Sequence, residues 1–260
     1  MIGSSTAGNL FAAMLIASGG LAAGGFAALL VADGPETAKV SAFAPAAELS
    51  AQARFFGGRI EQALAAKDAY DETRQSQVLL DASTLAVLGL VLGMHDEDHD
   101  LKKSAPAIVK AAQSLGENHP DYDRAVAAWA QLKPALAGEA AGAVPPKWEV
   151  VAEMGPLMKQ VPIVHTMLTR VVDDQRRFKR QAAEAAAQAT TLAAIAQAAW
   201  FDTSLVADDA DSAAWHELCL AMRDESAAAA QAIRAGDRAA AGAAVERLNR
   251  NCEACHEKFR

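Results

Sequence analysis

The feature that most constrains the fold is the helical spacing of apolar residues near the end of the chain. One series, within residues 212–234, consists of Trp215, Leu218, Cys219 and Met222. A second closes the chain and consists of Val245, Leu248, Cys252, Cys255, His256 and Phe259. Successive members lie one, three or four residues apart, so each series follows one side of a helix and needs a partner helix to cover it.

Composition extends the helical prediction to the rest of the chain. Alanine is the most frequent residue, aromatic residues make up only 5%, and β-branched residues do not form alternating runs. These properties favour long helices over strands. We therefore predict an all-α protein.

Two breaks that helices do not readily cross divide the chain. Asp33-Gly34-Pro35 is the first, and Gly142-Ala143-Val144-Pro145-Pro146 is the second. Short connections between the helices predict an antiparallel four-helix bundle on each side of the second break. The expected parts are an N-terminal hydrophobic helix in 1–33, a four-helix unit at 43–140, a linker at 141–147 and a second four-helix unit at 148–260. In the second unit we expect helices near 149–172, 174–200, 212–234 and 237–258.

The two units share an apolar pattern. Leu85, Leu88 and Leu92 recur in a similar context as Leu192, Ile195 and Ala199. This recurrence suggests an old duplication, although such spacings also arise by chance in an alanine-rich chain, and two unrelated helical units remain the alternative.

Residues 10–32 are apolar except for Ser18. Their length suits a membrane-crossing helix, so we expect either an uncleaved anchor or a cleaved signal segment. Both alternatives place the rest of the chain on the periplasmic side. Gly20 and Gly24 have the small-xxx-small spacing of dimerising membrane helices, a spacing that chance also produces here, so a homodimer stays open.

Cys252-Glu253-Ala254-Cys255-His256 is a C-x-x-C-H motif, the pattern of covalent c-type haem attachment. Residues i, i+3 and i+4 of a helix share a face, so both sulfurs can reach the porphyrin vinyl groups while the imidazole reaches the iron. We predict one covalent haem c, with thioethers from Cys252 and Cys255 and His256 as iron ligand.

Other uses of these residues fit less well. Structural zinc needs four spread ligands, and Cys219 is the only further thiol. A redox dithiol is expected to open a helix after a strand, and a disulfide between cysteines three residues apart on a helix has poor geometry. We interpret Cys219 itself as a buried thiol.

The ending NCEACHEKFR resembles that of class II c-type cytochromes, the cytochrome c′ family and its low-spin relatives, over residues of about 148–260. The resemblance implies a four-helix bundle whose last helix carries the haem. It also implies that Arg260 lies near the haem, although a cation there equally suits the end of a helix dipole.

The resemblance implies that the sixth iron ligand decides the function. Low-spin members use a Met of the first helix, whereas cytochrome c′ proper leaves the site open. Met158 resembles that Met by position, with Met154 one turn earlier and His165 two turns later. Pro156 and Pro162 disturb this helix, so sequence alone does not fix which side chain points inward, and a Met here is otherwise core filler.

We therefore expect a periplasmic electron carrier with His256 and Met158 as iron ligands and a redox protein as partner. The alternative is a five-coordinate protein that binds nitric oxide or carbon monoxide. An enzyme is not expected, because no distal acid–base pair is evident, and no catalytic residue is assigned. The net charge of -8 argues against nucleic acid as a partner and suits a positively charged redox protein.

An acidic run at His95–Asp100 contains histidine and carboxylate side chains, which are ligands for divalent cations. A solvated acidic loop is the favoured interpretation.

Overall fold

The computed structural model describes residues 38–117, 121–140 and 146–260, and within them the chain is helical with no strand. The all-α prediction is therefore confirmed for this part of the chain. The expected N-terminal helix in 1–33, with Gly20 and Gly24, lies outside the described residues.

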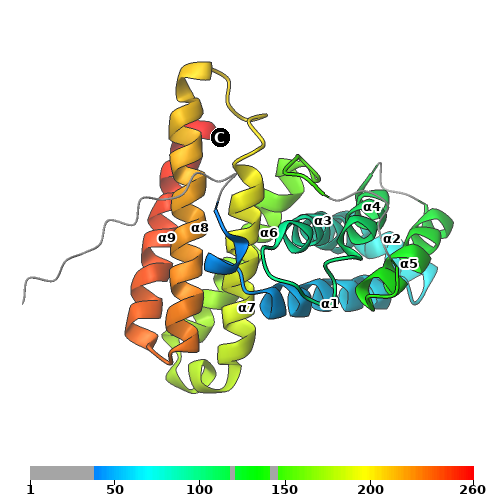
Figure 1. Ribbon diagram of the computed structural model, residues 1–260, viewed down its shortest axis with the longest axis horizontal. Helices are drawn as coiled ribbons and strands as arrows, with labels where there is room; N and C mark the ends of the chain where they lie inside the picture. The colour runs from blue at the N-terminus through cyan, green and yellow to red at the C-terminus, as the bar shows by residue number, and fades with distance from the viewer. Residues whose placement is uncertain (1–37, 118–120, 141–145) are drawn as a thin grey trace, which may run out of the picture. The chain divides into compact units, whose positions relative to one another are not determined.

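The C-terminal half is a bundle of α6 (Met154–Asp173), α7 (Gln175–Ala199), α8 (Ser212–Arg234) and α9 (Arg238–Phe259), shown in Figure 1. A short 3-10 helix, η3 (Asp209–Asp211), precedes α8. Helix α7 packs on α6 and α8, α8 packs on α9, and α9 returns to α6. The helix limits predicted for this half are confirmed for the last three helices to within a residue or so.

Helix α6 begins later than expected, at Met154 rather than near 149. The preceding segment is held outside the helix, because Gln113 Nε2 donates a hydrogen bond of 3.1 Å to the carbonyl oxygen of Val151. The Val151 side chain is buried against the N-terminal half. A tertiary contact therefore sets the start of this helix.

Local sequence explains the other helix starts in the bundle. The Asp174 carboxylate accepts hydrogen bonds from two backbone N–H groups of the first turn of α7, and the Asp237 carboxylate accepts one from the Ala240 N–H at the start of α9. Gly236 ends the connection from α8 with a φ of 73°, a conformation that glycine adopts without strain.

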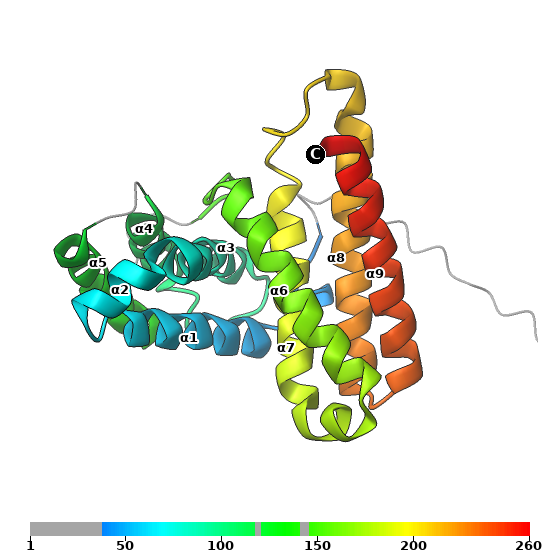
Figure 2. The same cartoon turned by 180° about the vertical axis from the view of Figure 1, so that it is seen from behind.

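The N-terminal half contains five α-helical segments within its described residues: α1 (Ala46–Ala63), α2 (Lys67–Thr73), α3 (Leu79–Met94), α4 (Ala105–Gly116) and α5 (Tyr122–Leu136), with a 3-10 turn, η1 (Val40–Ala42), before them. A π-helical turn, η2 (Arg74–Val78), joins α2 to α3. Helix α3 packs on α1 and α4, and α5 packs on α4 and α1, as Figure 2 shows from behind.

One helical run in the described residues, Lys67–Met94, is long and apolar enough by composition to cross a membrane. However, 78% of its most apolar window is buried inside the protein. Burial by α1, α4, α6 and α7 accounts for its hydrophobicity, as expected for a core helix.

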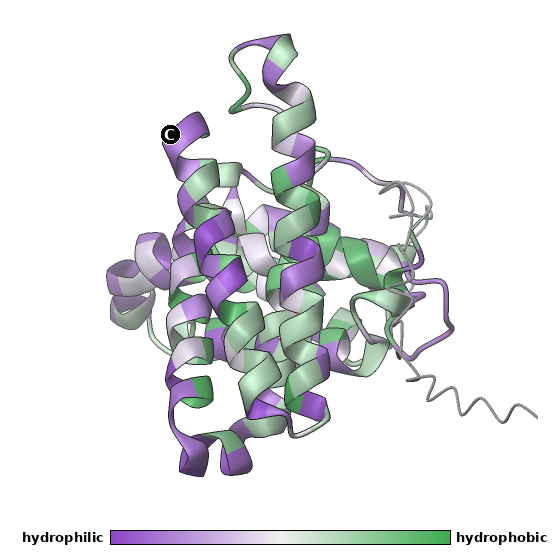
Figure 3. Ribbon diagram, turned by 90° about the vertical axis from the view of Figure 1, so that its left-hand side faces the viewer, coloured by the Kyte–Doolittle hydropathy of each residue, from purple (hydrophilic) through white to green (hydrophobic). Residues whose placement is uncertain are grey.

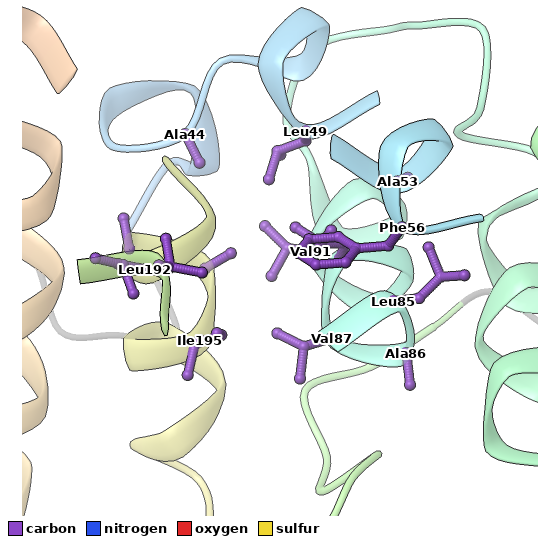
Figure 4. Close-up of a cluster of buried hydrophobic side chains, with 14 of the residues drawn as sticks. Ala44, Leu49, Ala53, Phe56, Leu85, Ala86, Val87, Val91, Leu192 and Ile195 are labelled. Carbon is purple, nitrogen blue, oxygen red and sulfur yellow. The ribbon is translucent and has the colours of Figure 1, made fainter. Parts of the chain in front are cut away.

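The two halves share one hydrophobic core. Side chains of α1 and α3 face those of α7 in Figure 4, and Phe56, Val87 and Ile195 are each at most 2% exposed. Helix α3 also packs on α6. The described residues of the two predicted units therefore form one compact body.

Leu192 lies at this shared core and is fully buried. We expect Leu192→Ala to lower the free energy of unfolding by about 2–5 kcal/mol, through lost burial and a residual cavity. Because the core is shared, hydrogen-exchange protection should fall in α1 and α3 as well as in the bundle. Urea unfolding and hydrogen exchange measure both effects.

The matched control is Leu205→Ala, since the Leu205 side chain is 43% exposed and its truncation should change stability by no more than about 0.5 kcal/mol. Loss of protection confined to α6–α9 in Leu192→Ala would show that the halves are energetically independent.

Asp81 of α3 is a fully buried carboxylate. Its Oδ2 accepts a hydrogen bond of 2.8 Å from Arg59 Nε, while Oδ1 has no hydrogen-bond partner among the described residues. Burial raises the pKa of Asp81 from 3.8 to about 6, against the opposing effect of Arg59. The folded protein therefore binds a proton at Asp81 more tightly than the unfolded chain does.

This raised pKa predicts that the free energy of unfolding falls as pH rises from about 4 to about 6. Each pKa unit corresponds to about 1.4 kcal/mol, so the shift to about 6 corresponds to about 3 kcal/mol. Asp81→Asn should remove this contribution in urea titrations at pH 4 and pH 7. Asp96→Asn is the control, because the pKa of Asp96 is lowered rather than raised. The variant should still lose free energy of unfolding as the pH rises from about 4 to about 6.

Candidate haem site

A cavity between α6, α8 and α9 contains all three residues of the C-x-x-C-H motif. Cys252, Cys255 and His256 line it from α9, and Met158 and His165 line it from α6. The structure thus brings the motif together with two of the three side chains proposed from sequence as the sixth ligand. The cavity volume is about 140 Å³.

The exposure of the motif residues differs from the expected pattern. Val245 and Leu248 are buried and the two thiols are half-buried, but His256 is exposed. The expectation that the imidazole continues the buried face was therefore wrong. Cys255 and His256 lie about 100° apart around the helix. Cys255 packs against Trp215 and Cys219, while His256 lies at the open side of the cavity.

The structure resolves which face of α6 points inward. Pro156 lies in the first turn, where proline is tolerated, and the helix continues through Pro162 to Asp173. Met154 is 4% exposed, packs in a cluster with Ala199, Trp215 and Cys219, and does not line the cavity. Met158 and His165 line it instead.

His165 has a distinctive environment. Its Nε2 atom is buried and has no hydrogen-bond partner within the described residues. Met158 is half-buried and contacts both hydrophobic clusters of the protein. The two candidates from α6 therefore differ: one presents an unsatisfied nitrogen and the other fills apolar space.

The far wall of the cavity is apolar and held by specific contacts. Trp215 Nε1 donates a hydrogen bond of 3.1 Å to the Ala199 carbonyl oxygen, and Phe259 packs edge-to-face on the Trp215 ring at 5.2 Å. Asn251 Nδ2 donates a hydrogen bond of 2.9 Å to the Leu218 carbonyl oxygen. These contacts fix the last turns of α9 against α8.

Asn249 and Asn251 also line the cavity, although neither is among the site residues predicted from the sequence. Asn249 lies one turn before Cys252, on the same side of α9, so helical spacing from the motif was the available signal. Arg260 is exposed and does not line the cavity, so its proposed position near the haem stays a prediction.

Burial controls the protonation of the thiols. It raises the pKa of Cys219 to about 12, with further contributions from Cys255 and Asp202. Burial also raises the pKa of Cys252 and that of Cys255. All three thiols are therefore protonated at neutral pH, and Cys219 is the hardest to ionise.

The residues present fit a covalent haem. The two thiols of the motif, the thiol of Cys219 and two imidazoles line a largely apolar cavity, and this set includes the donors that a haem with thioether links requires. In the described part of the chain, no group of three His, Cys, Asp or Glu side chains could hold a bare metal ion. A haem differs in this respect because the porphyrin supplies most of the iron ligands.

The cavity is smaller than the roughly 300–1,000 Å³ of pockets that enclose a whole ligand. A haem attached to Cys252 and Cys255 would therefore extend through the open side, where His256 is exposed. The last turn of α9 beside this opening is hydrophilic, as Figure 3 shows.

The acidic run at His95–Asp100 is tied into the fold by structural contacts. His95 Nε2 lies 3.1 Å from the Ala44 carbonyl oxygen, and His99 Nε2 lies 2.9 Å from that of Leu92. Asp100 pairs with Arg54. These partners support the interpretation as an acidic loop.

No protein-family model, curated protein or solved structure matches the chain.

We predict that the three thiols are alkylated at different rates in the protein before haem is attached. Cys252 and Cys255 are half-buried, whereas Cys219 is 6% exposed with a pKa of about 12. Because the thiolate is the reactive form, iodoacetamide should label Cys219 most slowly, by an order of magnitude or more. Peptide mass spectrometry measures the three rates. In urea, where the chain is unfolded, the three thiols should react at equal rates, which serves as the control. Equal rates in the folded protein as well would contradict the packing of α8 against α9.

Proposed function

We propose that the protein is a mono-haem c-type cytochrome that transfers single electrons on the periplasmic side of the membrane. The observation that carries this proposal is the single cavity lined by Cys252, Cys255 and His256 from α9 and by donor side chains from α6. A C-x-x-C-H motif has this chemistry only where a cavity can receive the cofactor.

Each residue has a defined task in this proposal. Cys252 and Cys255 hold the cofactor through thioether bonds, and His256 is the proximal iron ligand. A side chain of α6 is the second protein ligand, with Met158 and His165 as the candidates that line the cavity. When bound, haem supplies a ferric–ferrous couple that accepts and releases one electron.

A second protein ligand favours electron transfer over catalysis, because an iron with both axial positions occupied does not readily bind a substrate. The net charge of -8 suits a positively charged redox protein as partner. The apolar segment at 10–32 would anchor the chain to the membrane or direct its export. These points support a carrier that meets its partner outside the cytoplasm.

The alternative is a five-coordinate haem protein that binds nitric oxide or carbon monoxide. This alternative is supported by the apolar side chains of Val161 and Pro162, which line the cavity. In the sequence they lie between the two candidate ligands of α6. If neither α6 donor bound iron, these side chains would leave room for a diatomic ligand. The class II resemblance includes both types of protein.

Covalent haem is the first test. Expression with a c-type haem attachment system should give a protein whose haem survives denaturation and organic extraction. Cys252→Ala and Cys255→Ala should each reduce the bound haem to a single thioether or none. Cys219→Ala should retain full covalent haem, because Cys219 lies outside the motif. A wild-type protein without covalent haem would contradict the proposal.

The spin state then separates the two functions. A low-spin ferric spectrum without a carbon monoxide adduct supports the electron carrier. A high-spin ferric spectrum with a stable carbon monoxide adduct supports the gas-binding alternative.

A further inference from the structure

The unpartnered nitrogen of His165 is the most informative atom of the cavity. Seven side chains in the described residues have a buried nitrogen or oxygen without a hydrogen-bond partner, and among these His165 alone lines the cavity. Burying a polar atom without a partner is unfavourable, because the atom loses its hydrogen bonds to water and gains none in exchange. In native proteins such an atom is explained by a bound water or other group, or by stored strain. Because His165 lines the cavity and an imidazole nitrogen is a common haem-iron ligand, iron is a suitable partner for it.

The direction of the helices favours His165 as a partner for His256. Helices α6 and α9 pack together and run antiparallel, as Figure 2 shows. Side chains of a helix lean toward its N-terminus. From the end of α9, His256 therefore leans toward the middle of the bundle, and from the middle of α6, His165 leans toward its start. In an antiparallel pair these two directions converge.

Met158 also lines the cavity, but at a different level along α6. It lies two turns before His165, about 10 Å along the helix axis, and leans toward the start of α6. There it contacts the cluster that contains Met154, Trp215 and Cys219. A flexible thioether in that position fills an irregular gap in the core.

We propose that His165 Nε2 binds the haem iron on the side opposite His256, which makes the centre bis-histidine, and that Met158 packs as apolar filler. This inference rests on the proposed function, since it requires haem at Cys252 and Cys255. It gives a partner to the one buried side-chain nitrogen or oxygen that lacks one among the described residues lining the cavity. It also predicts a lower reduction potential than a Met/His centre would have, because a methionine ligand raises the potential.

The experiment compares ferric spectra of the haem-loaded full chain and three variants. Near-infrared magnetic circular dichroism and EPR distinguish nitrogen–nitrogen from nitrogen–sulfur axial ligation. We expect nitrogen–nitrogen ligation in the wild type and in Met158→Ala. His165→Ala should become high-spin and bind carbon monoxide, and added imidazole should restore its low-spin spectrum.

His216→Ala is the matched control. His216 lies on α8, stacks on Trp200 at 4.1 Å and does not line the cavity, so its removal should leave the axial ligation unchanged. Should His165→Ala fail to fold, the wild-type spectrum alone decides between nitrogen and sulfur.

Three other outcomes overturn the inference in different ways. Nitrogen–sulfur ligation that is lost in Met158→Ala would assign the ligand to Met158 and leave the electron carrier intact. A high-spin wild-type spectrum with a carbon monoxide adduct would contradict both the second protein ligand and the electron-carrier function. The proposed covalent attachment of haem would still hold. A chain without covalent haem would contradict the proposed function itself.

Discussion

The packing of the fold depends on the burial of α7 from all sides. Every residue from Ala185 to Ala199 is buried, and most are alanine. Small side chains let neighbouring helices approach closely, so α6, α8, α1 and α3 all pack on this one helix. Polar side chains fix its rotation, because Thr191 hydrogen-bonds Gln52 of α1 and Gln197 hydrogen-bonds Arg223 of α8.

This central helix also positions the cavity in which we propose that haem binds. Ala199, at its end, lines the cavity and accepts the hydrogen bond that orients Trp215. The wall formed by Trp215 in turn supports Phe259 on the last turn of α9. The placement of Cys252 and Cys255 therefore depends on contacts that begin in the core shared with α1 and α3. A defect in that core is expected to reach the cavity.

The limits of α7, α8 and α9 were predictable from the sequence, but the burial of α7 on all sides was not. Helices α8 and α9 carry regular apolar series, so their inward faces followed from spacing except at His256, and the motif placed the thiols. An alanine-rich helix such as α7 has no contrast between faces, so the shared core left no signal in the sequence. On α6, Pro156 and Pro162 obscured the inward face, and the exposure of His256 depended on how far α6 and α8 cover α9.

The N-terminal half has a structural role in this arrangement, because α1 and α3 cover apolar residues of α7. Without α1 and α3, buried residues of α7 such as Leu192 and Ile195 would face water, at about 1.5–3 kcal/mol for each such side chain. A bundle of α6–α9 alone would therefore expose an apolar face. Leu136, at the end of α5, is buried in the shared core. The half without a haem motif fills its own interior with side chains and covers the helix on which the cavity depends.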